Sequence, residues 1–152
     1  MSYRTKQIRG KEYIFCDWRR KYVRLTPEEW VRQQFLHYLV EQLRYPSSLI
    51  AVEIALSTGR RADAVVYSKQ LVPLVIIEFK ADSVALTQDT LDQAAAYNRQ
   101  LQVPYLILHN GINTIVGKIV PAINTPSAEN IPIQNHTIEF LDNIPSYSSL
   151  IS

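Results

Sequence analysis

Residues 61–67 read Arg-Ala-Asp-Ala-Val-Val-Tyr, and residues 74–80 read Leu-Val-Ile-Ile-Glu-Phe-Lys. Both runs have the length and apolar composition of buried β-strands. Side chains alternate along a strand, so Glu78 and Lys80 lie on one face and the residue between them on the other. Asp63 in the first run adds a second carboxylate. Carboxylate oxygens hold Mg2+ and a nearby ammonium stabilises an attacked phosphate, so this set suits a divalent metal bound beside a phosphodiester.

The same acids also allow a purely structural interpretation. Burying an unpaired carboxylate in an apolar strand is costly, so a compensating partner is expected for Asp63 and Glu78. A metal ion is one such partner. The other is a salt-bridged cluster with Lys80, in which Arg60 and Arg61 neutralise the remaining charge. Spacing alone leaves both interpretations open.

Length and composition limit the class of protein. The chain has 152 residues, of which 47% are hydrophobic, which supports a single domain over residues 1–152. Cys16 is the only cysteine. A disulfide framework and a cysteine-based zinc site are therefore excluded, and a reducing compartment, the cytoplasm, is expected. The longest apolar run, around residues 71–77, is too short to span a bilayer, so no membrane role is expected.

Positive charge is concentrated at the N-terminus. Residues 1–27 hold eight Lys or Arg against two acids, although the net charge of the whole chain is only +2. Strand-like runs around a polar turn predict a β-hairpin over residues 11–25. Its basic side chains would contact phosphates, or would protect a sheet edge against aggregation. The candidate DNA-contacting residues in this hairpin are Arg19, Arg20 and Lys21.

A helix is predicted to begin after Thr26 and to run to about Arg44. Thr26 is a good N-cap, Pro27 suits the first helical position, and Glu29 would complete a capping box. The buried stripe at helical spacing consists of Val31, Phe35, Leu39 and Leu43. Gln34 lies on a flank of this stripe, so it is the candidate if the helix lends a polar side chain to a site.

The remaining elements follow from apolar runs separated by turn residues. Three strands should form an antiparallel meander, a second helix should follow, and two further strands should pair beyond it. These elements are expected at residues 49–56, 62–67, 71–79, 87–101, 105–108 and 114–116. A helix separates the strand ending at Lys80 from the one beginning at Tyr105, so these strands should be parallel and joined by a right-handed crossover. The expected fold class is α/β (α+β), a mixed sheet with flanking helices.

The C-terminal part is less regular. Three prolines among Asn, Ser and Thr predict an irregular loop over residues 121–135. A short strand is expected at residues 137–141. Residues 146–152 are polar and are expected to fray.

Gln93 and Tyr97 lie one turn apart on the second helix and therefore on one face. Gln93 would hydrogen-bond a phosphate or position Lys80, and Tyr97 would pack at the rim of the same cleft. Alternatively, Tyr97 packs the helix onto the sheet and Gln93 is a solvated neighbour.

Several motifs occur together in one order along the chain. They are residues 25–33, 45–46, 61–63, 77–80, 93–98 and 110–111. Together they resemble the N-terminal nuclease domain of type I restriction enzyme R subunits, a member of the PD-(D/E)XK nuclease superfamily. The match runs from about residue 12 to 118, which would be the core of the domain. The resemblance implies a restriction-endonuclease-like sheet in the order helix, three strands, helix, strand.

The resemblance also implies Mg2+-dependent DNA cleavage, with Mn2+ as a substitute. Asp63 and Glu78 would be metal ligands, joined by the Phe79 carbonyl, and Lys80 would stabilise the nucleophile and the developing phosphate charge. Gln93 and Tyr97 would match the family's Gln-x-x-x-Tyr element. Arg60 and Arg61 would contact phosphates. The partners implied are DNA and a motor or specificity subunit on another chain. A site built on one chain would need a second copy of this chain to cut both strands.

Two positions depart from the family pattern. Ala62 replaces the proline that precedes the aspartate, and Gln34 stands where related nucleases often carry a glutamate. A neutral amide there leaves one ligand fewer, so Glu29 or Glu53 substitutes, or the site binds one metal, or activity is reduced. The second hypothesis is therefore a noncatalytic DNA-binding or assembly module. A purely structural sheet cluster is the third.

Other chemistries are not supported by the sequence. His37, His109 and His136 are far apart and form no metal-ligand pairing, so a zinc site is not expected. His37 is expected on the helix surface. The chain also has no Gly-x4-Gly-Lys-Ser/Thr loop for phosphates, so any ATP-driven motor must come from another chain.

Overall fold

Two sheets and one long helix organise the computed structural model, which describes residues 3–55, 59, 61–98, 102–121 and 136–152. The first sheet is antiparallel and has the order β1-β2-β3. Its strands are β1 (Thr5–Ile8), β2 (Lys11–Cys16) and β3 (Lys21–Arg24). The hairpin expected over residues 11–25 is confirmed. The additional strand β1 was not expected, because its sequence Thr-Lys-Gln-Ile lacks an apolar run.

The second sheet has six strands in the order β4-β5-β6-β7-β8-β9. Only the β6–β7 pair is parallel, and the other pairs are antiparallel. The strands are β4 (Ile50–Ala55), β5 (Arg61–Tyr67), β6 (Pro73–Phe79), β7 (Tyr105–His109), β8 (Thr114–Pro121) and β9 (His136–Leu141). The predicted meander, the parallel crossover and the mixed sheet are therefore confirmed. The loop expected at residues 121–135 lies almost entirely outside the described residues.

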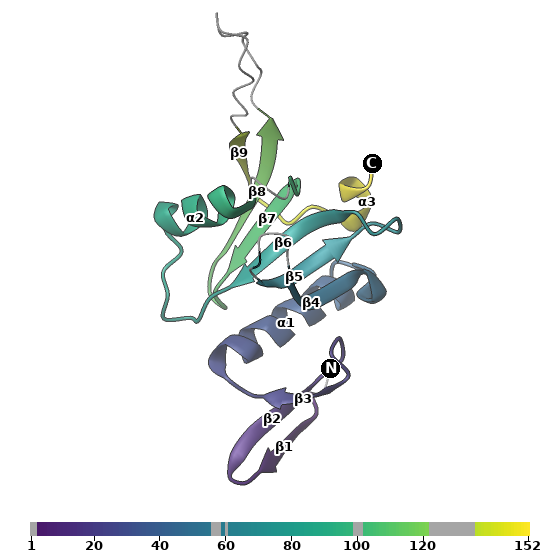
Figure 1. Ribbon diagram of the computed structural model, residues 1–152, viewed down its shortest axis with the longest axis vertical. Helices are drawn as coiled ribbons and strands as arrows, with labels where there is room; N and C mark the ends of the chain where they lie inside the picture. The colour runs from purple at the N-terminus through teal and green to yellow at the C-terminus, as the bar shows by residue number, and fades with distance from the viewer. Residues whose placement is uncertain (1–2, 56–58, 60, 99–101, 122–135) are drawn as a thin grey trace, which may run out of the picture.

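The two main helices cover opposite faces of the six-stranded sheet. They are α1 (Pro27–Glu41) and α2 (Gln88–Asn98), with a short 3-10 turn, η1 (Ser47–Leu49), after α1. Phe35 and Leu39 of α1 belong to the core on one face, whereas Leu91 of α2 belongs to the core on the other. Helix α1 also lies between the two sheets (Figure 1). The element order from α1 to β7 is thus helix, three strands, helix, strand.

Local signals explain where the helices begin and end. The Thr26 side chain accepts a hydrogen bond of 3.1 Å from the Glu29 N–H, as expected for an N-cap. The Thr87 hydroxyl similarly accepts from the Thr90 N–H at 3.3 Å. Helix α1 ends at Glu41, earlier than expected, because Arg44 adopts a left-handed conformation with φ of 62°. The sequence offers no glycine at that position to signal the turn.

The C-terminal segment corrects one expectation. Residues 146–152 were expected to fray, but Tyr147–Leu150 form helix α3 and Leu150 is buried. The Tyr147 hydroxyl donates to the Tyr67 carbonyl at 2.8 Å, and the Tyr45 hydroxyl donates to the Pro145 carbonyl at 2.5 Å. Two hydroxyl groups from distant residues therefore hold a segment whose own composition is polar.

His37 also differs from expectation, since it is buried rather than on the helix surface. Its ring lies against Tyr3 and Trp18, and its Nε2 atom is 3.4 Å from an Asp17 carboxylate oxygen. Burial lowers the pKa of His37, and the Asp17 charge opposes that shift only in part. The N-terminal sheet covers a face of α1 that would otherwise meet solvent.

No helix within the described part of the chain is long and apolar enough to cross a membrane.

Candidate functional site

Strands β5 and β6 bring Asp63 and Glu78 to neighbouring positions. Ala64 pairs with Ile77 in the antiparallel register, and one further step places Asp63 opposite Glu78. The Phe79 N–H donates a hydrogen bond of 2.8 Å to Asp63 Oδ2. This bond holds the Asp63 carboxylate against the strand that carries Glu78. Both acids are partly buried.

Lys80 continues the same strand edge. Its N–H donates to the His109 carbonyl at 2.9 Å, which extends the pairing of β6 with β7 by one residue. Strand alternation then places the Lys80 side chain on the face that carries Glu78. The positions of Asp63, Glu78 and Lys80 therefore lie at one end of β5 and β6.

The two faces of this edge have different surroundings. Ile77 and Phe79 belong to the core beneath α1, whereas Ile76 belongs to the core beneath α2. Since Glu78 and Lys80 alternate with the first pair, they lie on the α2 side of the sheet. Glu78 and Lys80 are thus separated from α1 by the sheet itself.

Glu53 occupies a special position in β4. The β4–β5 register places it opposite Asp63, but its backbone φ is 54°, in the left-handed region. Val52 belongs to the core beneath α1, whereas Ile54 packs against the core beneath α2. The regular alternation therefore breaks at Glu53. Its carboxylate lies 2.7 Å from the Arg32 guanidinium, and its side chain is 32% exposed.

Glu29 is held by a buried polar network on α1. One of its carboxylate oxygens pairs with Arg19, and the other accepts a hydrogen bond of 3.1 Å from the Gln33 amide. Arg32 Nε lies 3.7 Å from that second oxygen. Burial lowers the pKa of Arg19, but hydrogen bonds to Glu29 and to the Cys16 sulfur more than offset this and raise it. Glu29 and Glu53 are therefore both compensated by arginine.

Arg32 was not singled out from the sequence, and it is the residue that links these two acids. It is buried, and among the described residues its Nε and Nη1 atoms have no hydrogen-bond partner. One signal was available in the sequence. An arginine three residues after Glu29 lies on the same helix face, next to the buried stripe.

Gln34 lies in a different environment from the predicted metal ligands. It is exposed and lines a pocket of about 370 Å³, together with Phe35, Tyr38, His109, Gly111, Thr114 and Ile144. The His109 and Phe35 rings are 4.3 Å apart, which places this pocket on the α1 side. Burial lowers the pKa of His109, and a backbone hydrogen bond involving Asn113 opposes the shift.

The remaining predicted residues fall into three groups. Arg20, Lys21 and Arg61 are exposed, as is Gln93 on α2. Arg19 is engaged with Glu29, so its guanidinium is directed inward. Arg60 and the Tyr97 side chain lie outside the described residues.

Within the described residues no group of three or more His, Cys, Asp or Glu side chains could hold a metal ion. The Asp63–Glu78 edge accordingly offers two carboxylates. The Phe79 carbonyl could supply a third, main-chain oxygen at this edge. In an antiparallel pair the N–H and C=O of one residue point to the same neighbour, so the Phe79 carbonyl faces the strand of Asp63.

The family profile described as type I restriction enzyme R protein N terminus matches residues 27–145, more than half of the chain. The chain belongs to this family. Membership in the R-protein N-terminal family indicates a restriction-related nuclease module. The match contains Asp63, Glu78 and Lys80 but begins after the N-terminal sheet. Comparison with curated proteins finds no match.

Proposed function

We propose that this domain is a Mg2+-dependent DNA endonuclease of the PD-(D/E)XK type, with its site at the end of β5 and β6. One observation carries the proposal. The hydrogen bond from the Phe79 N–H to Asp63 Oδ2 fixes an aspartate beside a Glu-x-Lys strand end. That arrangement is the one a hydrolytic metal site on phosphodiesters needs, since it presents hard anionic oxygens beside a cation.

The residues at this edge fit one hard divalent ion. Asp63, Glu78 and the Phe79 carbonyl would supply only oxygen atoms, which is the donor set of Mg2+ and Mn2+. Mg2+ commonly uses one or two carboxylates and keeps several waters, so two acids are sufficient. When bound, the ion would polarise the phosphate and lower the pKa of the attacking water.

The chain's own residues supply the remaining functions. Lys80 places a positive charge beside Glu78, where it would stabilise charge that develops on the phosphate. The Phe79 N–H would hold the Asp63 carboxylate in one orientation, which reduces reorganisation during the reaction. Gln93 on α2 would hydrogen-bond a phosphate from the same side of the sheet. Arg61 would contact the DNA backbone next to the site.

A single ion suits this site better than two. Glu29 and Glu53, the candidate substitutes for a third acid, are both paired with arginines. Gln34 lies on the α1 side of the sheet, in the pocket with His109. Glu29 and Glu53 therefore both have structural partners.

Plasmid nicking tests this function. Purified protein is incubated with supercoiled DNA and Mg2+ or Mn2+, with and without a chelator. We expect metal-dependent nicking that Lys80→Ala lowers by about 10²–10³-fold, as for removal of one stabilising charge. Asp82→Asn is the matched control, because Asp82 is an exposed acid close in sequence to the site. Equal nicking by Lys80→Ala and wild type would remove the case for this site.

The second candidate is a noncatalytic DNA-binding or assembly module that works with a motor or specificity subunit on another chain. Two points support it: Gln34 stands where related nucleases often carry a glutamate, and Glu29 and Glu53 are both paired with arginines. Calorimetry with Mn2+ distinguishes the two. A module that lacks a metal site would give no binding heat at any concentration up to millimolar, yet would still bind DNA in a salt-dependent manner.

A further inference from the structure

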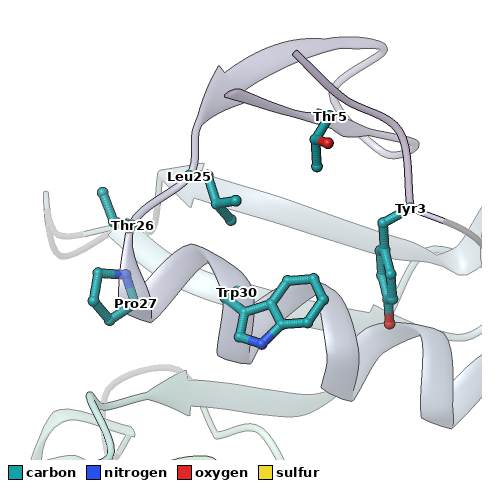
Figure 2. Close-up of a pocket in the computed structure, with 6 residues that line it drawn as sticks. All are labelled: Tyr3, Thr5, Leu25, Thr26, Pro27 and Trp30. Carbon is teal, nitrogen blue, oxygen red and sulfur yellow. The ribbon is translucent and has the colours of Figure 1, made fainter. Parts of the chain in front are cut away.

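The two faces of the N-terminal sheet differ in composition. On the inner face Ile14 and Cys16 are fully buried, and Val23 packs against the main core. Thr5 lines a shallow apolar pocket of about 460 Å³ with Trp30 of α1 (Figure 2). The inner face is therefore occupied by packing onto α1.

The outer face follows from the strand register. Lys6 pairs with Tyr13, and Tyr13 pairs with Arg24, which gives one row of side chains across the sheet. Phe15 pairs with Tyr22, and its N–H donates to the Arg4 carbonyl at 2.8 Å, which gives the adjacent row. These two rows alternate with Thr5, Ile14 and Val23, so they point away from α1. We call them the outer rows.

Cations and aromatic rings are interleaved in the outer rows. The Arg4 guanidinium lies 4.0 Å from the Phe15 ring centroid, and the Lys6 ammonium lies 4.0 Å from that of Tyr22. Arg24 lies 5.8 Å from the Tyr13 centroid. Contacts of this kind hold long cationic side chains in place at an exposed surface. Their N–H groups remain available at the surface.

No acidic residue lies in the outer rows, which the structure describes in full. Glu12 pairs with Gln7 in the register and shares the inner face with Ile14. Asp17 follows β2, where its oxygens lie 3.9 Å from Arg4 and 3.4 Å from His37. The outer face is thus positively charged and carries aromatic rings at regular strand spacing.

We propose that the outer rows bind a single strand of DNA. Arg4, Lys6 and Arg24 would contact successive phosphates, and Tyr22 with Phe15 would contact unpaired bases. Surfaces that bind single strands combine a positively charged track with aromatic side chains, because every unpaired base has a face or edge to pack. A duplex would use only the cations, since its bases are stacked on one another.

This inference deepens the proposed function and rests on it for the choice of DNA as the ligand. The surface itself lies outside the region that the family profile matches, which begins at residue 27. It is also on the far side of α1 from the six-stranded sheet (Figure 1). A strand held there would be retained by the domain independently of the Asp63–Glu78 edge.

Fluorescence anisotropy with a labelled thymidine 20-mer, in chelator and over a salt series, tests the proposal. The variant Arg4→Gln/Lys6→Gln/Arg24→Gln should weaken binding by about tenfold or more and reduce the salt slope by about 2, since each contact to a single strand contributes about 0.7. The matched control is Arg44→Gln/Lys69→Gln/Lys118→Gln, which removes the same charge from exposed positions elsewhere. Equal loss in both triple variants would overturn the proposal.

Two further measurements complete the test. Tyr22→Leu should weaken binding about fivefold or more, because base packing contributes in addition to charge. A 20-base-pair duplex should bind more weakly than the single strand, and equal affinity would overturn the assignment. Wild-type protein should bind the 20-mer equally well with and without chelator, whereas nicking depends on the metal, so a failure of this surface and a failure of the nuclease site give different results. Thermal melts confirm that each variant is folded.

Discussion

The pair Glu29 and Glu53 and the pair Asp63 and Glu78 lie in different surroundings. Glu29 and Glu53 are paired with Arg19 and Arg32, which neutralise their charge. Asp63 instead accepts a hydrogen bond from the main-chain N–H of Phe79, which fixes its orientation without bringing a positive charge. The comparison shows that residue type does not decide the role of an acid. The neighbour that compensates its burial does.

The largest effect is expected at Asp63, the acid that we propose as a metal ligand. Asp63→Asn should lower metal-dependent nicking by about 100-fold or more, because a neutral amide is a weaker ligand for Mg2+. Its free energy of unfolding should change by less than about 1 kcal/mol, since the amide oxygen can still accept from Phe79. Glu53→Gln is the matched variant and should cut within about twofold of wild type. If Glu53→Gln loses as much activity as Asp63→Asn, the distinction between the two pairs is broken.

A moderate loss of stability is expected when the arginine partner of Glu29 and Glu53 is removed. Arg32→Met would leave Glu29 with fewer partners and would remove the ion pair of Glu53. Removing one partner of a buried ion pair is strongly destabilising, and the partial exposure of Glu53 reduces the cost. We expect a loss of about 2 kcal/mol in urea unfolding, with nicking retained below the unfolding transition. An unchanged unfolding midpoint would show that the network does not support the helix.

The smallest expected effect is a pH dependence of stability that comes from the histidines and not from the carboxylates. Burial lowers the pKa of His37 and of His109 below the ordinary value of 6.5, so the unfolded chain binds protons more readily than the folded protein. The contribution of these two histidines to the free energy of unfolding should therefore be fully present above pH 6.5. It should be lost as the pH falls toward their folded-state pKa values. Thermal melts at pH 7.5 and 5.5 measure this, and His37→Gln should reduce the difference. A melting temperature that rises on acidification would contradict the assignment.

Much of the fold was predictable because its signals are local. Thr26 has the hydroxyl that caps α1, and the alternation around Glu78 and Lys80 requires only the period of a strand. The antiparallel pairing of β5 with β6 follows from the short connection between two apolar runs, whereas the register that brings Asp63 opposite Glu78 also depends on the shift between Val66 and Tyr67. By contrast, β1 was missed because the polar sequence of residues 5–8 becomes a strand only through pairing with β2.

The candidate site was predictable to the same extent. Spacing and resemblance indicated Asp63, Glu78 and Lys80, and the structure brings their positions to one edge. Spacing and resemblance could not show that Glu29 and Glu53 have arginine partners. Arg32 on α1 contacts Glu53 on β4 only in the folded chain. The burial of His37 was missed for the same reason, since the residues that cover it come from the N-terminal sheet.

The sequence by itself determined the order of the main helices and strands from α1 to β9, the shared face of Glu78 and Lys80, and the membership in the restriction R-protein N-terminal family. These depend on periodicity, capping and short connections, which act within a few residues. Only the tertiary structure decided which acids pair with arginines and which cations remain at the surface. It also decided how the hydroxyl groups of Tyr45 and Tyr147 anchor the C-terminal segment. Burial and charge compensation depend on groups from distant parts of the chain, and folding is what brings those groups together.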